Sequence, residues 1–188
     1  MDTEEYTQKE RLELLRLARR TIENYLRERK RDYPESTNPK FAQKRGVFVT
    51  LHRHGELRGC IGYPLPIKPL LQAVVDNAIA SATEDPRFPA VTADELDEID
   101  IEISVLTVPS EVGGVEDVQV GRDGIIISKD FNRGLLLPQV PVEQQWDLEE
   151  YISYGCLKAG LPRDTWRRGV KIETFQAIVF GEEEMKAS

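Results

Sequence analysis

Residues 47–61 read VFVTLHRHGELRGCI, and they carry the clearest structural signal in the chain. From Val47 to Leu51 apolar side chains alternate with other residues, and β-branched residues are frequent, which is typical of a strand with one buried face. A turn around Gly55 follows, and Leu57 to Ile61 then reads as a returning strand. The stretch predicts an antiparallel hairpin.

Burial constrains the register of this hairpin, because side chains that lie opposite each other share a face of the sheet. The apolar residues that should face the core together are Val47, Val49, Leu51, Leu57 and Ile61. A two-residue turn sends the two apolar sets to different faces, whereas a three-residue turn over residues 54–56 brings them together. We therefore expect Thr50 opposite Cys60 and His52 opposite Arg58.

This register places the side chains of Thr50, His52, Arg58 and Cys60 together on the other face of the hairpin, with Phe48 on the same face. These polar residues could form a reactive site. A guanidinium such as Arg58 beside the Cys60 thiol would lower its pKa and favour the nucleophilic or metal-binding thiolate. The His52 imidazole could act as the base. The alternative is that Cys60 only packs, because a free cysteine often behaves as a small hydrophobe.

The rest of the chain predicts few helices and several hairpins. Asn38-Pro39 should continue a loop, and the prolines at 64, 66 and 69 should break strand pairing. Without regular strand–helix alternation, the class is α+β with a largely antiparallel sheet. The other expected elements are helices after the capping residues Thr7, Thr92 and Asp147, a helix around 71–82, strands at 99–105, 118–120, 125–127 and within 170–180, turns at Asp123-Gly124 and 132–134, and a loose acidic tail at 183–188.

Composition excludes several functional classes. The 188 residues carry 33 acidic and 25 basic side chains, a formal net charge of −8, which disfavours nonspecific nucleic-acid binding. No apolar run approaches the ~20 residues of a membrane helix, and no signal peptide is recognisable. Two cysteines and two histidines match no zinc spacing, so no metal site is predicted. We expect reduced thiols and a cytoplasmic protein; any cofactor is unknown.

The hexapeptide LRGCIG at 57–62 resembles the signature of the AMMECR family, named from the Alport–midface-hypoplasia–elliptocytosis chromosomal region. Pro141 and Ala90 depart from residues that are frequent in the family, and neither lies in the hexapeptide. Further similar segments, in order over roughly residues 8–182, are 46–51, 85–88, 101–107, 123–125, 137–140, Trp146 and 158–161.

The resemblance implies a single AMMECR-type domain over 8–182 with a barrel-like, mostly antiparallel sheet flanked by helices. It also implies a larger lobe that holds both termini, a smaller lobe, and a hexapeptide near a cleft. The family has no established activity. Some prokaryotic members are associated with Memo-like and radical-SAM proteins, which suggests a role in an unknown modification pathway.

Two functions remain open on the sequence. In the first, the protein is an enzyme with catalytic residues Cys60, Arg58 and His52, acting on an unknown small molecule or protein. In the second, it is a binding or adaptor module in which Arg58 grips an anion or a partner's carboxylate and Cys60 only packs. Asp85 and Arg87 should pair across their loop. The residues expected to line the substrate site are Thr50, Gly59, Gly62, Asp85, Arg87, Glu102 and Ser104.

Overall fold

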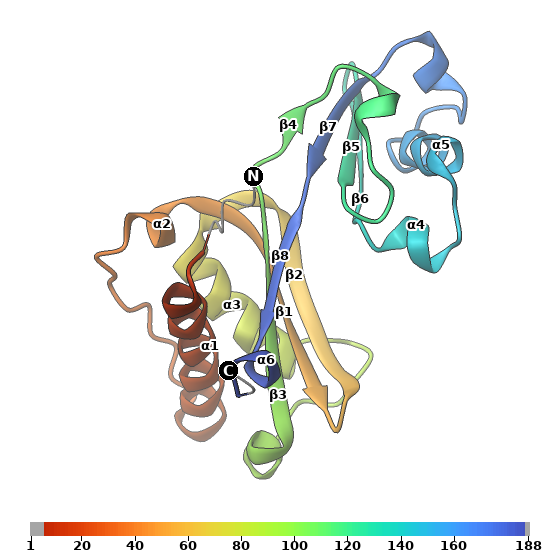
Figure 1. The fold of residues 1–188 in the computed structure, drawn as a ribbon. Helices are drawn as coiled ribbons and strands as arrows, with labels where there is room; N and C mark the ends of the chain where they lie inside the picture. Colours follow the sequence, from red (N-terminus) through yellow and green to blue (C-terminus); the bar gives the residue numbers. More distant parts are fainter. Residues whose placement is uncertain (1–5, 187–188) are drawn as a thin grey trace. The chain divides into compact units, whose positions relative to one another are not determined.

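The chain forms two compact units in a computed structural model that describes residues 6–186 (Figure 1). The larger unit contains the chain through Leu106 and again from Ile178 onward, and the smaller unit contains Thr107–Ala177. This division agrees with the larger and smaller lobes that the resemblance implies. Each unit has its own hydrophobic core.

The larger unit is built on a sheet whose strand order, within the described residues, is β2-β1-β3-β8. Both β2 and β3 run antiparallel to β1. Helices α1 and α3 lie against one face of this sheet (Figure 1). The elements of this unit are α1 (Gln8–Glu28), α2 (Pro39–Ala42), β1 (Lys44–Arg53), β2 (Glu56–Pro69), α3 (Leu70–Thr83), the 3-10 helix η1 (Ala93–Glu98), β3 (Ile99–Leu106), β8 (Ala177–Gly181) and α6 (Glu182–Lys186).

Local sequence signals account for the start of α1 and for the orientation of β3. The Thr7 hydroxyl accepts a hydrogen bond from the Glu10 amide while the Glu10 carboxylate accepts one from the Thr7 amide, which is the predicted capping box. In β3, Ile99, Ile101 and Ile103 are buried and the residues between them are partly exposed. The alternation predicted for this strand is confirmed, and it turns one face of the sheet to the helices.

One local prediction for the larger unit is wrong at Asn38, and another, at the prolines of β2, is confirmed. Asn38 caps the short helix α2 through the Lys40 amide, where the sequence predicts a loop. Strand β2 extends to Pro69, and the break in regular pairing predicted at the prolines is present, because the register with β1 shifts between Tyr63 and Lys68 and leaves Pro64 and Pro66 without partners.

The acidic tail is partly ordered. Residues 182–186 form α6, where the sequence predicts no regular structure, and residues 187–188 lie outside the described part. The Glu182 carboxylate accepts hydrogen bonds from the Arg19 guanidinium and from the Ile101 amide. The same guanidinium donates to the carbonyls of Leu96 and Ile99. One arginine thus ties α1, η1, β3 and α6 together.

The smaller unit contains the second sheet, in the order β4-β7-β5-β6. The predicted strand at 118–120 is absent, because the buried Asp123 carboxylate accepts the Gln119 amide and closes residues 119–123 into a turn. Strand β5 instead pairs with β6, across the turn at Asp130-Phe131. The elements of this unit are β4 (Ser110–Glu111), η2 (Val115–Asp117), β5 (Gly124–Lys129), β6 (Asn132–Leu136), α4 (Val140–Glu143), α5 (Leu148–Lys158), η3 (Thr165–Arg168) and β7 (Lys171–Phe175).

The predicted α+β class is confirmed, but the barrel-like closure is not. Within residues 6–186 the strands form two open sheets, with β2 and β8 at the edges of the first and β4 and β6 at the edges of the second. The predicted helix after Asp147 is present, with its Glu150 capping box and Gly160 in the left-handed region at φ 77°. No helix in the described part of the chain has both the length and the apolar character needed to cross a membrane.

Candidate functional site

The β1–β2 hairpin reaches the predicted pairing at Cys60 by a different route from the one expected. Its turn has two residues, His54 and Gly55, with φ of 53° and 79°, as a two-residue hairpin turn of type I′ requires. A bulge then leaves Arg58 unpaired, because Leu51 pairs with Gly59 and His52 pairs with Leu57. The predicted pair of Thr50 with Cys60 is confirmed.

The bulge has two consequences that sequence reasoning did not foresee. His52 lies opposite Leu57 instead of Arg58, and Leu57 is 40% exposed instead of buried. A two-residue turn alone would have set the apolar residues of the two strands on different faces. The extra residue at Arg58 restores the register for the rest of β2, so that Val49 pairs with Ile61 on the core side.

The face of the first sheet that points away from α1 and α3 carries most of the predicted polar site residues, and we call it the polar face. Thr50 lies between Cys60 on one side and Glu102 on the other, because it pairs with both. Ser104 is across from Phe48 and lies one row further along the sheet. The polar face is defined by five partly exposed residues: His52, Thr50, Cys60, Glu102 and Ser104.

Cys60 is a free cysteine in a partly exposed position, and its thiol, amide and carbonyl each have a hydrogen-bond partner. The Thr50 hydroxyl donates to the Cys60 sulfur at 3.3 Å. The Cys60 amide donates to the Asp85 carboxylate at 2.9 Å, and its carbonyl accepts from the Arg87 guanidinium at 3.4 Å. Since β2 is an edge strand, these two side chains supply backbone partners that a further strand would otherwise provide.

Arg58 does not direct its charge at this sulfur. Its guanidinium donates twice to the Glu95 carboxylate, at 3.0 and 3.1 Å, and once to the Pro89 carbonyl at 2.9 Å. Both side chains of the ion pair are largely buried, with 12% and 14% of their surface exposed. The hydrogen bonds from Arg58 lower the pKa of Glu95 to about 2, and the Thr92 amide contributes. The guanidinium that was expected beside the thiol therefore binds Glu95 in η1 and Pro89 in the loop before η1.

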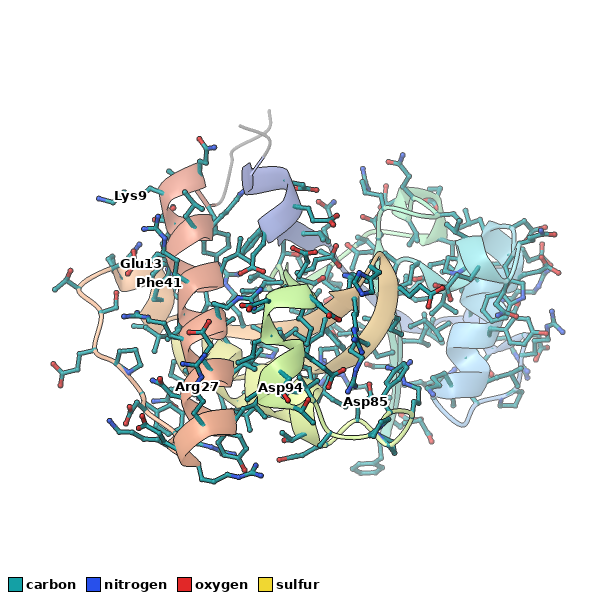
Figure 2. The ribbon with its side chains drawn as sticks, turned by 90° about the horizontal axis from the view of Figure 1, so that it is seen from below. Lys9, Glu13, Arg27, Phe41, Asp85 and Asp94 are labelled. Carbon is teal, nitrogen blue, oxygen red and sulfur yellow. The ribbon has the colours of Figure 1, made fainter. Side chains whose placement is uncertain are left out.

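Arg87, rather than Arg58, is the arginine that contacts Cys60, through its backbone carbonyl. It follows Asp85 in the loop after α3, which is labelled at Asp85 in Figure 2. The predicted pair is present: Nε and Nη2 of Arg87 donate to the two carboxylate oxygens at 3.0 and 2.8 Å. These bonds hold the pKa of Asp85 well below its usual range, and Asp85 is 5% exposed. The arginine side chain itself is 55% exposed.

The two glycines of the hexapeptide are explained by the approach of backbone and of an aromatic ring. A Cβ on Gly59 would lie 2.1 Å from the Ser81 carbonyl oxygen at the end of α3. A Cβ on Gly62 would lie 2.3 Å from the Val47 carbonyl oxygen and 2.5 Å from the Phe48 ring. Both glycines therefore position Cys60 by letting neighbouring elements come close.

His52 is the histidine nearest to Cys60 in the pairing scheme. It lies on the polar face two residues from Thr50 and pairs with Leu57, so the bulge at Arg58 lies between it and Cys60. His54 lies at the hairpin turn, where 72% of its side chain is exposed, and it faces Glu98 at 3.3 Å. Within residues 6–186, no group of three or more His, Cys, Asp or Glu side chains is placed to hold a metal ion.

The second cysteine lies in a contrasting environment. Cys156 is fully buried in the core of the smaller unit, and this burial raises the pKa of its thiol. A cavity of about 440 Å³ adjoins the first sheet on its helix-covered side, between α1 and Ile99, and it contains none of the predicted site residues. The site is thus a constellation on the polar face, with a sulfur, a donor hydroxyl and an anchored guanidinium.

Sequence reasoning missed the partners of Arg58. Glu95 was assigned only to the capping box at Thr92, which it does complete through the Thr92 amide at 2.9 Å. Nothing in the spacing of Arg58 and Glu95 signals that they meet, because their contact depends on the path of the loop between α3 and β3. The bulge was missed because a two-residue turn followed by one extra residue gives the same register from Cys60 onward as a three-residue turn.

Comparison with known proteins gives consistent results. The model of the AMMECR1 family matches residues 15–180. The chain is 52% identical to protein MJ0810 of Methanocaldococcus jannaschii, over 90% of this chain and 89% of that protein. It is 50% identical to protein TK0174 of Thermococcus kodakarensis, with the same coverage. The crystal structure of the uncharacterized protein PH0010 from Pyrococcus horikoshii matches with a TM-score of 0.71 at 48% identity, over 90% of both chains.

Proposed function

The chain belongs to the AMMECR1 family, and we propose that it is an enzyme whose reaction proceeds through the thiol of Cys60. The observation that carries the proposal is the hydrogen bond of 3.3 Å between the Thr50 hydroxyl and the sulfur of Cys60, a partly exposed residue. The hydroxyl is placed to donate to the sulfur once the thiol proton has left during the reaction. A cysteine that only packs is usually buried, as Cys156 is.

The rigidity of the surroundings also supports a catalytic role. The Cys60 amide is held by Asp85, its carbonyl is held by Arg87, and Gly59 lets the end of α3 close against the strand. Catalysis depends on a reacting atom held in a defined position by groups that are themselves fixed. The neighbours of Cys60 supply such a frame from two elements, β1 and the loop after α3.

The proposed step is attack by the sulfur on an electrophilic carbon of the substrate. The thiol proton leaves to water or, through water, to His52, and the sulfur lone pair forms the new carbon–sulfur bond. The leaving group departs with the electron pair of the bond that breaks. Glu102 and Ser104, on the next strand of the polar face, would contact the more distant part of the substrate.

The binding-module alternative is less well supported. It requires Arg58 to grip an anion, but the donors of that side chain already bind Glu95 and Pro89. Releasing Arg58 would leave a largely buried carboxylate without its strongest partner, which is unfavourable. No observation in the described residues favours that module over the thiol.

A genetic replacement tests the proposed function. In a strain lacking the gene, wild-type protein and the Cys60→Ala variant are expressed to equal levels, and small-molecule profiles are compared by mass spectrometry. An enzyme that needs the Cys60 sulfur should leave the Cys60→Ala strain with the same accumulated substrate and missing product as the strain without the gene.

The matched control is Cys156→Ala, which removes the other thiol and should restore the wild-type profile when its level is matched. The proposal fails if Cys60→Ala restores the wild-type profile. It also fails if neither cysteine variant differs from wild type in any compound that the deletion changes.

A further inference from the structure

Arg87 combines features that suit it to bind a ligand rather than only to hold its loop. Its Nε and Nη2 atoms are engaged side-on by Asp85, which fixes the plane of the guanidinium. Its Nη1 atom donates no hydrogen bond to any residue of the described chain, and more than half of the side chain is exposed. A guanidinium held in this way presents its remaining donors to carboxylate or phosphate oxygens without first losing side-chain entropy.

The anchored edge of this guanidinium lies beside Cys60, because Nη2 donates both to Asp85 and to the Cys60 carbonyl. Nη2 of Arg87 is 3.4 Å from the Cys60 carbonyl oxygen, so the charge is adjacent to the residue that carries the sulfur. Hydrogen bonding with Asp85 raises the pKa of Arg87. Arg87 therefore stays positively charged while it is exposed next to the thiol.

The buried partner of Arg87 keeps the local charge balanced without blocking the ligand. The Asp85 carboxylate accepts hydrogen bonds from Arg87 and from the Cys60 amide, and it is almost entirely buried. Glu95, a second carboxylate of the region, is turned to Arg58 and Arg53. Glu102 lies on the polar face beyond Thr50, on the next strand. An anion arriving at Arg87 would thus meet the exposed side of the guanidinium, away from the carboxylate of Asp85.

We propose that Arg87 binds an anionic group of the substrate, a carboxylate or a phosphate, and places the neighbouring electrophilic carbon at the Cys60 sulfur. This inference rests on the proposed function and specifies its substrate class. Arg87 is then a specificity-determining residue, and Asp85 positions both the arginine and the cysteine. The shared chemistry is an oxyanion within a few bonds of the reacting carbon.

Two alkylating reagents of nearly equal size, one anionic and one neutral, test the proposal on the intact protein. Iodoacetate carries a carboxylate next to its reactive carbon, and iodoacetamide carries a neutral amide in the same place. In both reactions the Cys60 thiolate forms a carbon–sulfur bond, iodide leaves with its bonding electrons, and the thiol proton goes to buffer. Peptide mass spectrometry measures the two rate constants at Cys60, and their ratio is compared with the ratio for the same residue in urea.

Charge-assisted hydrogen bonds to Arg87 should raise the iodoacetate-to-iodoacetamide ratio of the folded protein about tenfold above that of the unfolded chain. Arg87→Gln should return the ratio to the unfolded value. Arg87→Lys keeps the charge but loses the fork, so it should retain part of the preference. If Arg87→Gln only disturbed the loop, the iodoacetate and iodoacetamide rate constants would change by the same factor and their ratio would stay at the wild-type value. The ratio therefore separates a binding role of Arg87 from a purely structural one.

The control is Arg122→Gln, which removes an arginine of the smaller unit that is paired with a buried aspartate in the same side-on manner and is 50% exposed. It should leave the ratio at Cys60 unchanged. Salt tests the wild-type protein without any variant, because 1 M NaCl shortens the screening length to about 3 Å and should abolish most of the preference.

Adding inorganic phosphate or acetate distinguishes the two oxyanions, since the preferred one should slow iodoacetate at the lower concentration. The inference is overturned if Cys60 reacts with both reagents in the unfolded ratio, or if Arg87→Gln keeps the wild-type ratio; the reactive thiol would then stand without its anion site. If folded Cys60 reacts with neither reagent, the proposed function itself fails.

Discussion

Two arginines lie near Cys60, and their surroundings suit one to stabilising the fold and the other to binding a ligand. Arg58 precedes the cysteine by two residues but donates to Glu95 and Pro89, with 12% of its side chain exposed. Arg87 is distant in the chain but donates to the Cys60 carbonyl from a side chain that is 55% exposed. A largely buried ion pair contributes mainly to stability, whereas a half-exposed, anchored cation is available to a ligand.

Arg58→Met should therefore destabilise the larger unit without altering selectivity at Cys60. It leaves a largely buried carboxylate without its main donors, so we expect a loss of about 1–3 kcal/mol in the free energy of unfolding, measured by urea denaturation near neutral pH. Arg53→Met is the control, because Arg53 is 39% exposed and contacts the same Glu95, and its loss should stay below about 1 kcal/mol. Equal losses for the two variants would contradict this account.

The Glu95 carboxyl predicts an acid dependence of stability. Its pKa is about 2 in the folded protein and 4.5 ordinarily, first because of the hydrogen bonds from Arg58. A lowered folded pKa means that its stabilisation is fully present above pH 4.5 and is lost as the pH falls through 2. The stability difference between wild type and Glu95→Gln should therefore be largest at neutral pH and shrink steadily below pH 4.5. A difference that is constant from pH 7 to pH 2 would show that the ion pair does not set it.

At the scale of elements, the β1–β2 hairpin presents Cys60 through a turn, a bulge and an approach by the end of α3. The bulge at Arg58 turns that side chain out of the regular ladder while it keeps Cys60 opposite Thr50. The loop after α3 then supplies Asp85 and Arg87 to the free edge of β2. Removing any one of these features should displace the cysteine before it unfolds the sheet.

Gly59→Ala tests the approach of α3. The new methyl group would lie 2.1 Å from the Ser81 carbonyl oxygen, which belongs to a helix backbone and cannot rotate away. We expect a loss of at least about 2 kcal/mol in the free energy of unfolding, at the upper end of overpacking effects. Gly181→Ala, in β8 of the same sheet, should be tolerated, because its nearest neighbours would lie at 3.6–3.9 Å. A well-tolerated Gly59→Ala would mean that α3 does not constrain Cys60.

The elements that the sequence predicted well are those with local signals. The capping residues Thr7 and Asp147 and the alternation from Ile99 to Ile103 were sufficient for α1, α5 and β3. The sequence also placed Thr50 opposite Cys60 and paired Asp85 with Arg87. These features depend on residues close together in the chain or on burial of one face.

The features that the sequence could not predict depend on tertiary contacts. The path of the chain between α3 and β3 brings Glu95 to Arg58. The hairpin has a two-residue turn followed by a bulge instead of a three-residue turn, and both give the same pairing of Thr50 with Cys60. Residues 118–120 have strand-like composition but are held in a loop by the buried Asp123. The roles proposed for Cys60 and Arg87 remain predictions.

At the scale of the whole molecule, the described residues form two cores that share no buried residue. Ile103 is fully buried in the core of the larger unit, and Ile127 is fully buried in that of the smaller unit. Cores of this kind can open separately, with free energies below that of global unfolding. The polar face with Cys60 belongs entirely to the larger unit.

Ile103→Ala and Ile127→Ala should each cost about 2–5 kcal/mol of stability in the unit concerned. Hydrogen exchange should show that Ile103→Ala reduces amide protection mainly in the larger unit and that Ile127→Ala does so mainly in the smaller. If each variant reduces protection equally in both units, the molecule unfolds as one cooperative body and the separation of the cores has no energetic meaning.

The rate at which neutral iodoacetamide modifies each cysteine of the native protein tests the central claim most directly. Cys60 should react in the folded state about as fast as in urea, because the residue is partly exposed and its sulfur is hydrogen-bonded to the Thr50 hydroxyl. Cys156 should react only after unfolding, because it is fully buried. A folded Cys60 that is protected as strongly as Cys156, and that becomes reactive only on global unfolding, would contradict the assignment of Cys60 as the reacting group.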